Sequence, residues 1–238
     1  MKALARWLML VLGALLALQL FFVGRIALMA WVNPESTSFE RSEAWRLLNT
    51  KGSVPWRQQW VDYGDISDAL KRAVIASEDD SFVNHSGVEW DAIEAAWKKN
   101  AKAEALALKR PGKKPPKIVG GSTITQQLAK NLLLSGERTL LRKGQEFVLT
   151  EALEILLTKR RILELYLNHV EWGEGIFGAE AAARHYFGKS SAGLGAYEAA
   201  RLAVMLPRPK YFEKLPNSSY VAGRAMTIVG RMQNAELP

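Results

Sequence analysis

The stretch ISDALKRAVIASEDDSFVNHSG, residues 66–87, sets the fold class of this chain. Its first half places apolar side chains at Ile66, Leu70 and Val74, which is the spacing of an amphipathic helix. Helical spacing continues along the rest of the chain, and alternating runs of useful length are missing. We therefore expect a mainly α domain, with helices near 66–77, 88–107, 123–134, 138–158, 160–168, 176–187, 196–205 and 218–233.

An apolar span precedes this domain. From Trp7 to Gly24 the chain has no charge, and these 18 residues are close to the roughly 20 that cross a bilayer as a helix. Lys2 and Arg6 come before the span, so we expect a cytoplasmic N-terminus with the remainder of the chain outside. A cleaved signal peptide is the alternative, but the span is longer than the usual apolar region of about 7 to 15 residues.

Composition limits the remaining choices. With 238 residues, of which 48% are hydrophobic, the chain has room for an anchor and one domain with a core. Cysteine is absent, which excludes disulfides and thiolate metal sites. The formal charge of +8 is concentrated in the basic insert, residues 98–117, where prolines predict a mobile loop. Charge alone suits nucleic acid, anionic lipid, a phosphorylated substrate, or a solvated loop.

The first candidate for chemistry is the acidic pair that ends the helix predicted over 66–77. Glu78 and Asp79 lie where the helix dipole is negative, which disfavours a carboxylate. Together with Phe82 and His85 nearby, this placement can raise one carboxyl pKa toward the range of a general base. Two solvated acids in a loop are the alternative.

The second candidate, GGSTITQQLAKN, residues 120–131, has glycines that lead into a helix. Ser122 or Thr123 can cap this helix, and free backbone N–H groups at its start can receive an anion or a sugar. Lys130 follows about two turns later. An ordinary helix with a good cap explains the same residues.

A third group lies on the next predicted helix. The four-residue spacing of Arg138, Arg142 and Glu146 puts them on one stripe, with Lys143 beside it. Surface ion pairs explain this stripe equally well. The segment 161–168 is amphipathic, and we interpret it as scaffold.

In order and spacing, these motifs resemble the signature of the peptidoglycan glycosyltransferases, glycosyltransferase family 51. The elements are Glu-Asp-x-x-Phe-x-x-His-x-Gly, Gly-x-Ser-Thr-Ile-Thr-Gln-Gln-Leu-x-Lys-Asn, Arg-Lys-x-x-Glu and Arg-Ile-Leu-Glu-x-Tyr-Leu-Asn, and the resemblance covers roughly residues 55–215. Ser-x-x-Lys and Lys-Thr-Gly elements of a transpeptidase are missing, so the match is to the monofunctional members. The resemblance implies a lysozyme-like helical lobe with a smaller membrane-facing jaw.

The residue patterns and the family resemblance together give a layout. We expect the cytoplasmic N-terminus and transmembrane anchor over 1–32, a linker and jaw entry over 33–53, and the glycosyltransferase domain over 54–238. The linker would carry a short amphipathic helix around Ser42 to Leu48, and Val54 to Tyr63 would be extended. The protein would lie in the bacterial inner membrane with its catalytic domain in the periplasm.

By the same resemblance the substrate is lipid II, and the product is a β-1,4 glycan strand that stays attached to its lipid. Glu78 matches the general base. Cations would stabilise the departing pyrophosphate, and other motif residues would shape the donor and acceptor pockets. The expected substrate-binding residues are Asp79, Phe82, His85, Ser122, Thr123, Gln126, Gln127, Lys130, Asn131, Arg138, Arg142 and Lys143.

Glu146 matches the second glutamate of the family. It either organises the cations, which we favour, or helps to hold Mg²⁺ or Mn²⁺ at the pyrophosphate; no cofactor is a fixed requirement. Expected partners are lipid II, the nascent lipid-linked glycan, the membrane, and penicillin-binding and division proteins, but no nucleic acid. Two other functions remain open: a lytic or hydrolytic muramidase, and a catalytically silent scaffold for cell-wall assembly.

Overall fold

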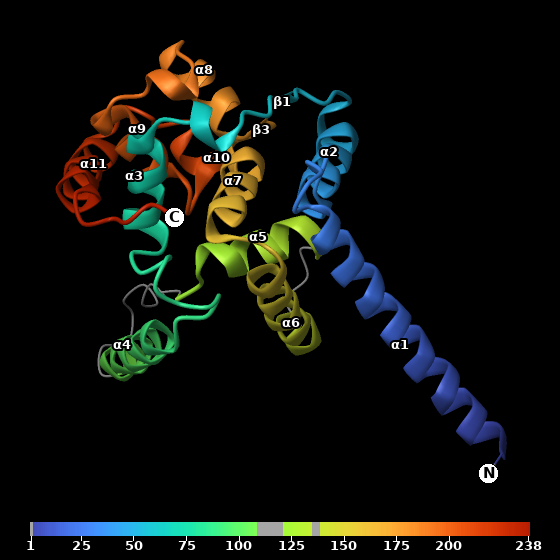
Figure 1. Ribbon diagram of the computed structural model, residues 1–238. Helices are drawn as coiled ribbons and strands as arrows, with labels where there is room; N and C mark the ends of the chain where they lie inside the picture. The colour runs from blue at the N-terminus through green and yellow to red at the C-terminus, as the bar shows by residue number, and fades with distance from the viewer. Residues whose placement is uncertain (1, 109–120, 135–138) are drawn as a thin grey trace.

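Helix α1, Lys2–Leu28, extends away from the rest of the chain as a rod in the computed structural model (Figure 1). The structure describes residues 2–108, 121–134 and 139–238. Within these ranges α1 is the one helix that is long and apolar enough to cross a membrane. Most of its side chains are exposed, Gln19 being half-buried, until the last turns, where Ile26 enters the protein core. The expected single anchor helix is therefore present, and it is longer than the apolar span at both ends.

Helices account for most of the described chain. The long ones are α2 (Ser38–Lys51), α3 (Asp68–Glu78), α4 (Trp90–Leu108), α5 (Ile124–Leu133), α6 (Leu140–Leu156), α7 (Lys159–His169), α8 (Ala179–Phe187), α9 (Ala196–Met205) and α11 (Ser219–Met232). The short elements are the helix α10 (Pro209–Phe212), the 3₁₀ turns η1 (Tyr63–Asp65) and η2 (Ser191–Gly193), and the strands β1 (Arg57–Gln58), β2 (Glu171–Gly173) and β3 (Ile176–Phe177). The mainly α prediction is confirmed.

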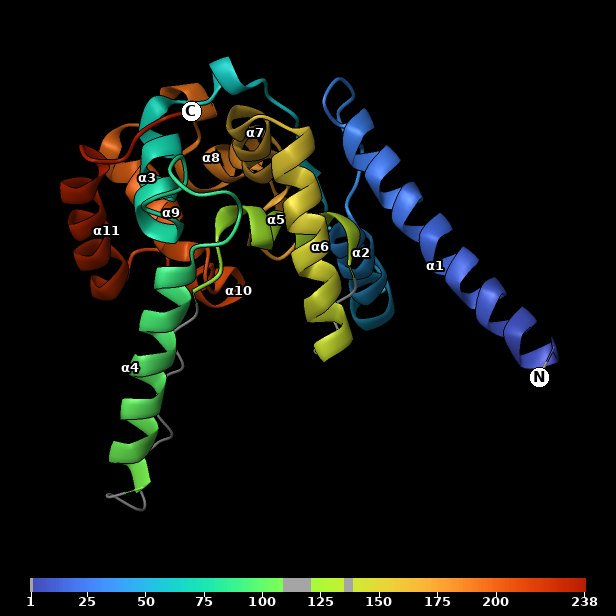
Figure 2. The same ribbon diagram turned by 60° about the horizontal axis from the view of Figure 1, so that its bottom comes forward.

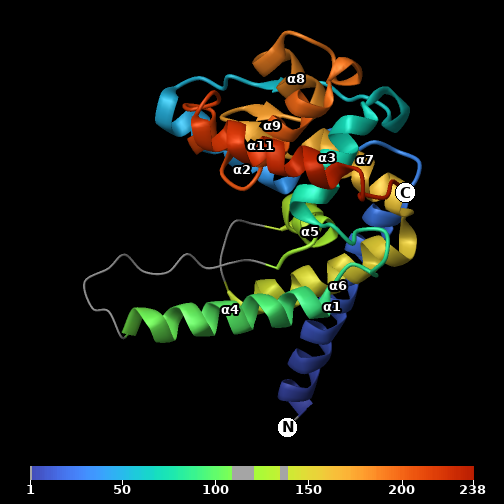
Figure 3. The ribbon, with the colours of Figure 1, turned by 90° about the vertical axis from the view of Figure 1, so that its left-hand side faces the viewer.

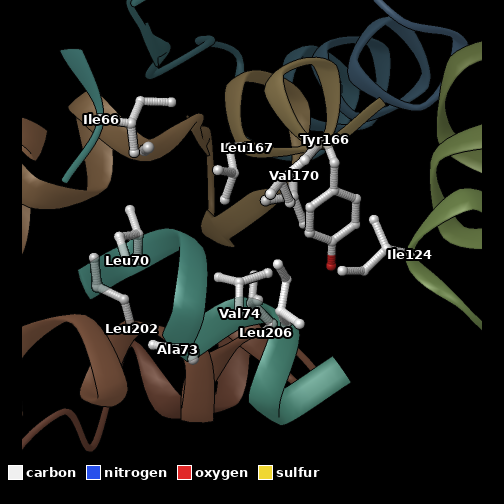
Figure 4. Packing of buried hydrophobic residues seen from close by; sticks show 14 of the residues in the cluster. Ile66, Leu70, Ala73, Val74, Ile124, Tyr166, Leu167, Val170, Leu202 and Leu206 are labelled. Carbon is white, nitrogen blue, oxygen red and sulfur yellow. The ribbon is translucent and has the colours of Figure 1, made fainter. Parts of the chain in front are cut away.

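The core of the main lobe forms where α3 packs against α9 and α11. Leu70 and Val74 of α3 face Leu202 and Leu206 across this contact, and α7 closes the layer from the other side (Figure 4). Leu70 and Leu202 are fully buried. This packing fixes α3 along its length, and so it fixes the direction in which the end of α3 points.

A small sheet departs from the helical prediction. The strand order is β1-β3-β2, with β3 parallel to β1 and antiparallel to β2. The helix predicted over 176–187 therefore begins only at Ala179, because Ile176 and Phe177 belong to β3. Gly178, at φ +82°, makes the turn between the two elements, and a Cβ there would lie 2.7 Å from the carbonyl oxygen of Asn168.

Helices α1, α4 and α6 lie on the opposite side of α5 from the main lobe (Figures 1 and 3). In the view of Figure 2 they spread apart, with α6 between α4 and α1. Large apolar side chains on these helices face solvent, among them Trp97 at 74%, Leu141 at 89% and Ile155 at 79% exposure. This side of the protein has the composition of a surface that meets a bilayer.

A reciprocal pair of side-chain amides joins α1 to α6. Gln19 Nε2 donates to Gln145 Oε1 over 2.8 Å, and Gln145 Nε2 donates to Gln19 Oε1 over 3.1 Å. Gln19 lies well inside the apolar span, where an unpaired amide would be costly and a paired one holds two helices together. The anchor is thus attached to the helix that carries Glu146.

The segment predicted as a linker, residues 33–53, is mostly the helix α2. Thr37 and Glu40 form a capping box at its start, and it is longer than the short helix expected around Ser42 to Leu48. The extended segment expected over 54–63 contains only the two residues of β1 as strand. The basic insert is helical from Lys98 to Leu108 as the end of α4, and the rest of it lies outside the described residues.

Candidate active site

Glu78 is the last residue of α3, and its carboxylate is partly buried. Burial is the largest effect on it and raises its pKa above the ordinary value, while hydrogen bonds from Gln127 and Ser77 oppose the rise. The charge of Asp79 adds to the rise. The pKa of Glu78 is therefore shifted in the expected direction, but the loss of water on burial raises it more than the charge of Asp79 does.

Two further side chains hold this carboxylate in place. Gln127 Nε2 donates to Glu78 Oε2 over 3.0 Å, and the hydroxyl of Tyr166 donates to Gln127 Oε1 over 3.0 Å. Tyr166 is buried in the core, and its hydroxyl end points toward α5 beside Ile124 (Figure 4). Because the tyrosine occupies the carbonyl oxygen of Gln127, the amide N–H₂ is left to face Glu78.

Asp79 is buried and joins the end of α3 to the start of α5. Its Oδ2 accepts from the backbone N–H of Ile124 over 2.9 Å, and its Oδ1 accepts from His85 Nε2 over 2.8 Å. Thr123 caps α5 and accepts from the N–H of Gln126, whose side chain accepts in return from the N–H of Thr123. Hence the expectation of free N–H groups for an anion is wrong at Thr123, Ile124 and Gln126: the protein supplies its own acceptors there.

The loop between α3 and α4 is fixed by Phe82 and Gly87. Phe82 is fully buried, and Lys159 Nζ lies 4.5 Å from the centre of its ring. Gly87 adopts φ +82°, and its carbonyl oxygen accepts from Thr123 Oγ1 over 2.6 Å. Phe82, His85 and Thr123 therefore shape this loop from within, while their predicted contacts with substrate stay a prediction.

A cationic hollow of about 360 Å³ lies between α5 and α6. Both helices supply polar and charged side chains to it. The lining residues are Phe39, Ser122, Gln126, Gln127, Lys130, Asn131, Leu134, Arg142, Lys143 and Glu146. The structure thus brings together seven of the predicted substrate-binding residues with Glu146, whereas Arg138 lies outside the described residues.

Glu146 is buried beneath two cations of its own helix. Arg142 Nη1 lies 2.9 Å from Glu146 Oε2, and Lys143 Nζ bonds to Oε1 of the same carboxylate. Both cations also line the hollow, so one buried carboxylate holds two positive charges at its wall. Thr139 caps α6 by accepting from the N–H of Arg142, which fixes the turn that carries this group.

The carboxylate of Glu146 bears on the expected choice between a metal ligand and an organiser of cations. Mg²⁺ at a pyrophosphate is usually held by one or two free carboxylates together with phosphate oxygens and waters. Both oxygens of Glu146 are already bonded to cations, and the described part of the chain contains no group of three His, Asp or Glu side chains that could hold a metal. The arrangement fits the organising role of Glu146 better than the metal-binding role.

Glu78 faces a second, acidic hollow of about 190 Å³. Asp79, Asp80, Glu89 and Arg231 also line it. Ser122 lines both hollows, and Gln127 lines the cationic hollow while it bonds to Glu78 on the other side. The start of α5 is therefore the wall between a carboxylate with a raised pKa and a cluster of cations.

A family model described as Transglycosylase matches residues 46–233, which is most of the chain. The chain belongs to the transglycosylase family. The resemblance inferred from the four motifs is thereby confirmed, and the protein is a glycosyltransferase.

Relatives of nearly the same length support this assignment to the transglycosylase family. A protein of Burkholderia thailandensis named biosynthetic peptidoglycan transglycosylase is 51% identical over 241 residues, which cover 100% of this chain and 90% of that protein. A protein of the same name from Paraburkholderia phytofirmans is 52% identical over 239 residues, covering 98% of this chain and 94% of the relative. A third, from Burkholderia orbicola, is 51% identical over 226 residues, covering 95% and 88%.

Tyr166, Phe39 and Arg231 are among the site residues of this transglycosylase that the sequence analysis missed. Tyr166 lies in the segment interpreted as scaffold, and its contact with Gln127 depends on the packing of α7 against α5, which the sequence does not show. Phe39 lines the cationic hollow, and Arg231 lines the acidic one, where its Nη2 lies 3.0 Å from Asp80 Oδ2. Neither lies within the motifs, so the sequence gives no local signal for them.

Proposed function

We propose that this transglycosylase polymerises lipid II into β-1,4 glycan strands and releases undecaprenyl pyrophosphate. The observation that carries the proposal is the shared wall at the start of α5, with Glu78 on one side and a set of cations on the other. Joining two sugars from a lipid pyrophosphate needs both groups: a base for the acceptor and positive charge for the leaving group.

Glu78 is the base in this proposal. It takes the proton from the 4-hydroxyl of the acceptor N-acetylglucosamine while that oxygen forms a bond to C1 of the donor N-acetylmuramic acid. The bond from C1 to the pyrophosphate oxygen breaks in the same displacement, so the configuration at C1 inverts. A pKa raised by burial suits the role, because it makes the carboxylate a better proton acceptor than a solvated glutamate.

The cationic hollow receives the pyrophosphate of the donor. Arg142 and Lys143, held by Glu146, and Lys130 on the facing helix present positive charge where negative charge develops on the leaving oxygen. Arg138 takes the same role by resemblance. Ser122, Gln126 and Asn131 contribute polar groups for the sugars and the phosphates.

The anchor gives the site access to its substrate. The apolar helix α1 fits a single-pass protein of the inner membrane. We place the N-terminus in the cytoplasm, the catalytic domain in the periplasm, and Lys2 and Arg6 on the inner side. A site confined to the membrane surface meets a lipid-borne substrate at a high effective concentration.

The other two functions fit the site less well. A muramidase cuts a neutral glycan and has no pyrophosphate leaving group to stabilise. That function therefore does not explain the positive charges of Arg142, Lys143 and Lys130. A silent scaffold does not need a carboxylate with a raised pKa beside an oriented amide. Neither alternative accounts for both hollows.

One assay separates the three functions. The full-length protein in detergent is incubated with labelled lipid II and, separately, with preformed glycan. Polymer from lipid II supports the proposal, shortening of the preformed glycan indicates a muramidase, and binding without conversion indicates a scaffold.

Matched variants then test the role of the cations. Arg142→Ala should raise the KM for lipid II and weaken binding of a phosphoglycolipid inhibitor, because both ligands present phosphate to the hollow. Arg224→Ala is the control, since Arg224 lies exposed on α11, outside both hollows. Equal kinetics of the two variants would contradict the proposed role of Arg142.

A further inference from the structure

A separate hollow of about 270 Å³ lies at the junction of α1 with the segment that leads to α2. It is lined by Arg25, Leu28, Met29, Val32, Asn33, Pro34, Glu35 and Ser36. None of these residues takes part in the cationic or the acidic hollow. The junction hollow, as we call it, therefore needs its own explanation.

The position of the junction hollow is set by the anchor. Arg25 is the first charged residue after the apolar span that ends at Gly24, so it lies where a membrane-spanning helix leaves the hydrocarbon region. Trp31, at 82% exposure, follows soon after Arg25 in the chain, and Trp45, at 67%, lines a hollow together with Arg41. Tryptophans gather at the level of lipid headgroups. The hollow therefore opens at headgroup depth.

The charges around the junction hollow are unbalanced. Within residues 2–108, 121–134 and 139–238, the side chain of Arg25 has neither a hydrogen bond nor an ion pair, and its one electrostatic neighbour is a second cation, Arg41. Arg41 Nη1 donates to the carbonyl oxygen and to Oγ of Ser36, over 3.1 and 3.0 Å, and so it is held at the rim. Glu35 also lines the hollow but pairs with neither arginine.

A second, open hollow of about 410 Å³ continues from Arg41, lined by Ser38, Arg41, Ser42 and Trp45. Arg41 Nη2 donates to Ser38 Oγ over 3.1 Å. Toward the membrane, Phe21 and Leu18 lie about one and two turns before Arg25 on the same face of α1, and they are exposed at 59% and 45%. The region thus offers two cations between hydroxyls on one side and apolar surface on the other.

We propose that the junction hollow binds the phosphate of an anionic phospholipid between Arg25 and Arg41. The acyl chains lie along Phe21 and Leu18 of α1, and the polar end of the headgroup lies toward Ser38 and Ser42. Two like charges that repel each other become partners of one phosphate when the lipid is bound. The site does not depend on the proposed catalytic chemistry.

Native mass spectrometry of the full-length protein in a neutral detergent tests the proposal. The probes are phosphatidylglycerol, which carries a net negative charge, and phosphatidylcholine, which does not. Wild-type protein should retain more phosphatidylglycerol than phosphatidylcholine. Arg25→Gln and Arg41→Gln should each lower retention of phosphatidylglycerol about fivefold, the effect of one basic residue near an anionic membrane surface.

Control variants decide how the other results of this experiment are interpreted. Arg224→Gln, on the exposed face of α11, should retain as much phosphatidylglycerol as the wild type. Arg25→Lys keeps the charge, so it should bind more phosphatidylglycerol than Arg25→Gln if the effect of Arg25→Gln comes from the lost charge. Thermal melting checks that both Arg25 variants are folded. If neither is folded, the retention of phosphatidylglycerol by Arg41→Gln decides whether the proposal holds. Equal retention of the two lipids, or unchanged retention in Arg25→Gln and Arg41→Gln, would overturn the proposal.

Two competitors separate the sources of phosphate. Inorganic phosphate in excess should leave the bound phosphatidylglycerol in place, and its displacement would show a site for free phosphate instead. Lipid II should likewise not displace phosphatidylglycerol. If it did so only when Arg25 and Arg41 are present, the hollow would belong to the substrate and the assignment to a phospholipid would be wrong.

Discussion

The side-chain amide of Gln127 donates to Oε2 of Glu78 over 3.0 Å, so α5 holds the carboxylate that ends α3. This contact opposes the effect of burial, because a hydrogen bond to the ionised form lowers a carboxyl pKa. The balance between the two effects sets the pH range in which Glu78 can accept a proton.

Replacement of Glu78 by Gln should abolish polymerisation and also stabilise the protein at neutral pH. Loss of a positioned base costs about 10²–10⁴-fold in rate. Since the pKa of Glu78 is raised in the fold, its contribution to stability is fully present below the ordinary pKa and is lost as pH rises through the raised one. The melting temperature of Glu78→Gln minus that of the wild type should therefore be small near pH 4 and increase toward pH 8.

The fold and the inhibitor site serve as controls for this variant. Circular dichroism and phosphoglycolipid binding should be close to wild type, since the substitution leaves the cationic hollow unchanged. Near-normal turnover by Glu78→Gln would show that Glu78 is not the base.

Gln127→Ala should move the acidic limb of the kcat/KM profile to higher pH. Without the amide donor the ionised form of Glu78 loses a hydrogen bond, so the pKa of Glu78 rises further. Tyr166→Phe should produce a smaller shift in the same direction, because Gln127 then keeps its donor but loses the hydroxyl that orients it.

Asn131→Ala is the matched control for these two variants, because it lies on the same helix and lines the cationic hollow without contacting Glu78. Its rate can change, but the position of the acidic limb should not. An unshifted limb in Gln127→Ala would mean that Glu78 does not govern the pH dependence.

Glu146→Gln should raise the KM for lipid II while it leaves any response to divalent metal unchanged. Removal of the carboxylate releases Arg142 and Lys143, which it holds at the wall of the hollow, and a rise of about tenfold corresponds to the loss of one charged hydrogen bond. The assay is run for wild type and variant with MgCl₂ and with EDTA. If the ratio of the two rates collapses only in Glu146→Gln, Glu146 is a metal ligand after all.

Gly87→Ala should destabilise the protein by about 1–3 kcal/mol. Gly87 has φ +82°, and a Cβ at this position would lie 2.8 Å from Thr150 Cγ2 and 2.9 Å from Glu154 Cγ. The loop that carries Phe82 would have to shift away from α6. Urea unfolding of the full-length protein in detergent measures the change.

Gly223→Ala is the control for the glycine variant. Gly223 lies inside α11 with open space around it, so a Cβ there should stabilise the helix by about 0.5–1 kcal/mol. Equal effects of the two substitutions would mean that the loop at Gly87 tolerates a side chain.

Much of the fold follows from local patterns in the sequence. The apolar spacing of α3 and α9 predicts their bounds to within two residues, because each buries one face against the other. The small sheet escaped prediction because its strands have two or three residues, too few to show an alternating pattern. They are held by backbone pairing across long sequence separations, and no local signal reports such pairing.

The sequence predicted only part of the candidate site, again because some contacts join residues that are far apart in the chain. Motifs with fixed spacing contain Glu78, Arg142 and Glu146, so these residues can be identified from one sequence. Tyr166, by contrast, acts through Gln127, which is 39 residues away in the sequence. Only the packing of α7 against α5 shows that relationship. In the same way, only the contact between the end of α3 and the start of α5 shows that Asp79 is engaged by Ile124, and by His85 beside it.

The amide pair between Gln19 and Gln145 fixes the position of the anchor helix α1 relative to α6. Each residue of a helix adds about 1.5 Å of rise and 100° of rotation, so both the height and the rotation of α1 are set where Gln19 meets α6. A one-residue deletion between Gln19 and Ile26 would turn the amide away from its partner or tilt α6 with the cations it carries. The anchor therefore has a fixed register, and a transplanted span of equal length and hydrophobicity would replace it only if it carried an amide at the same height.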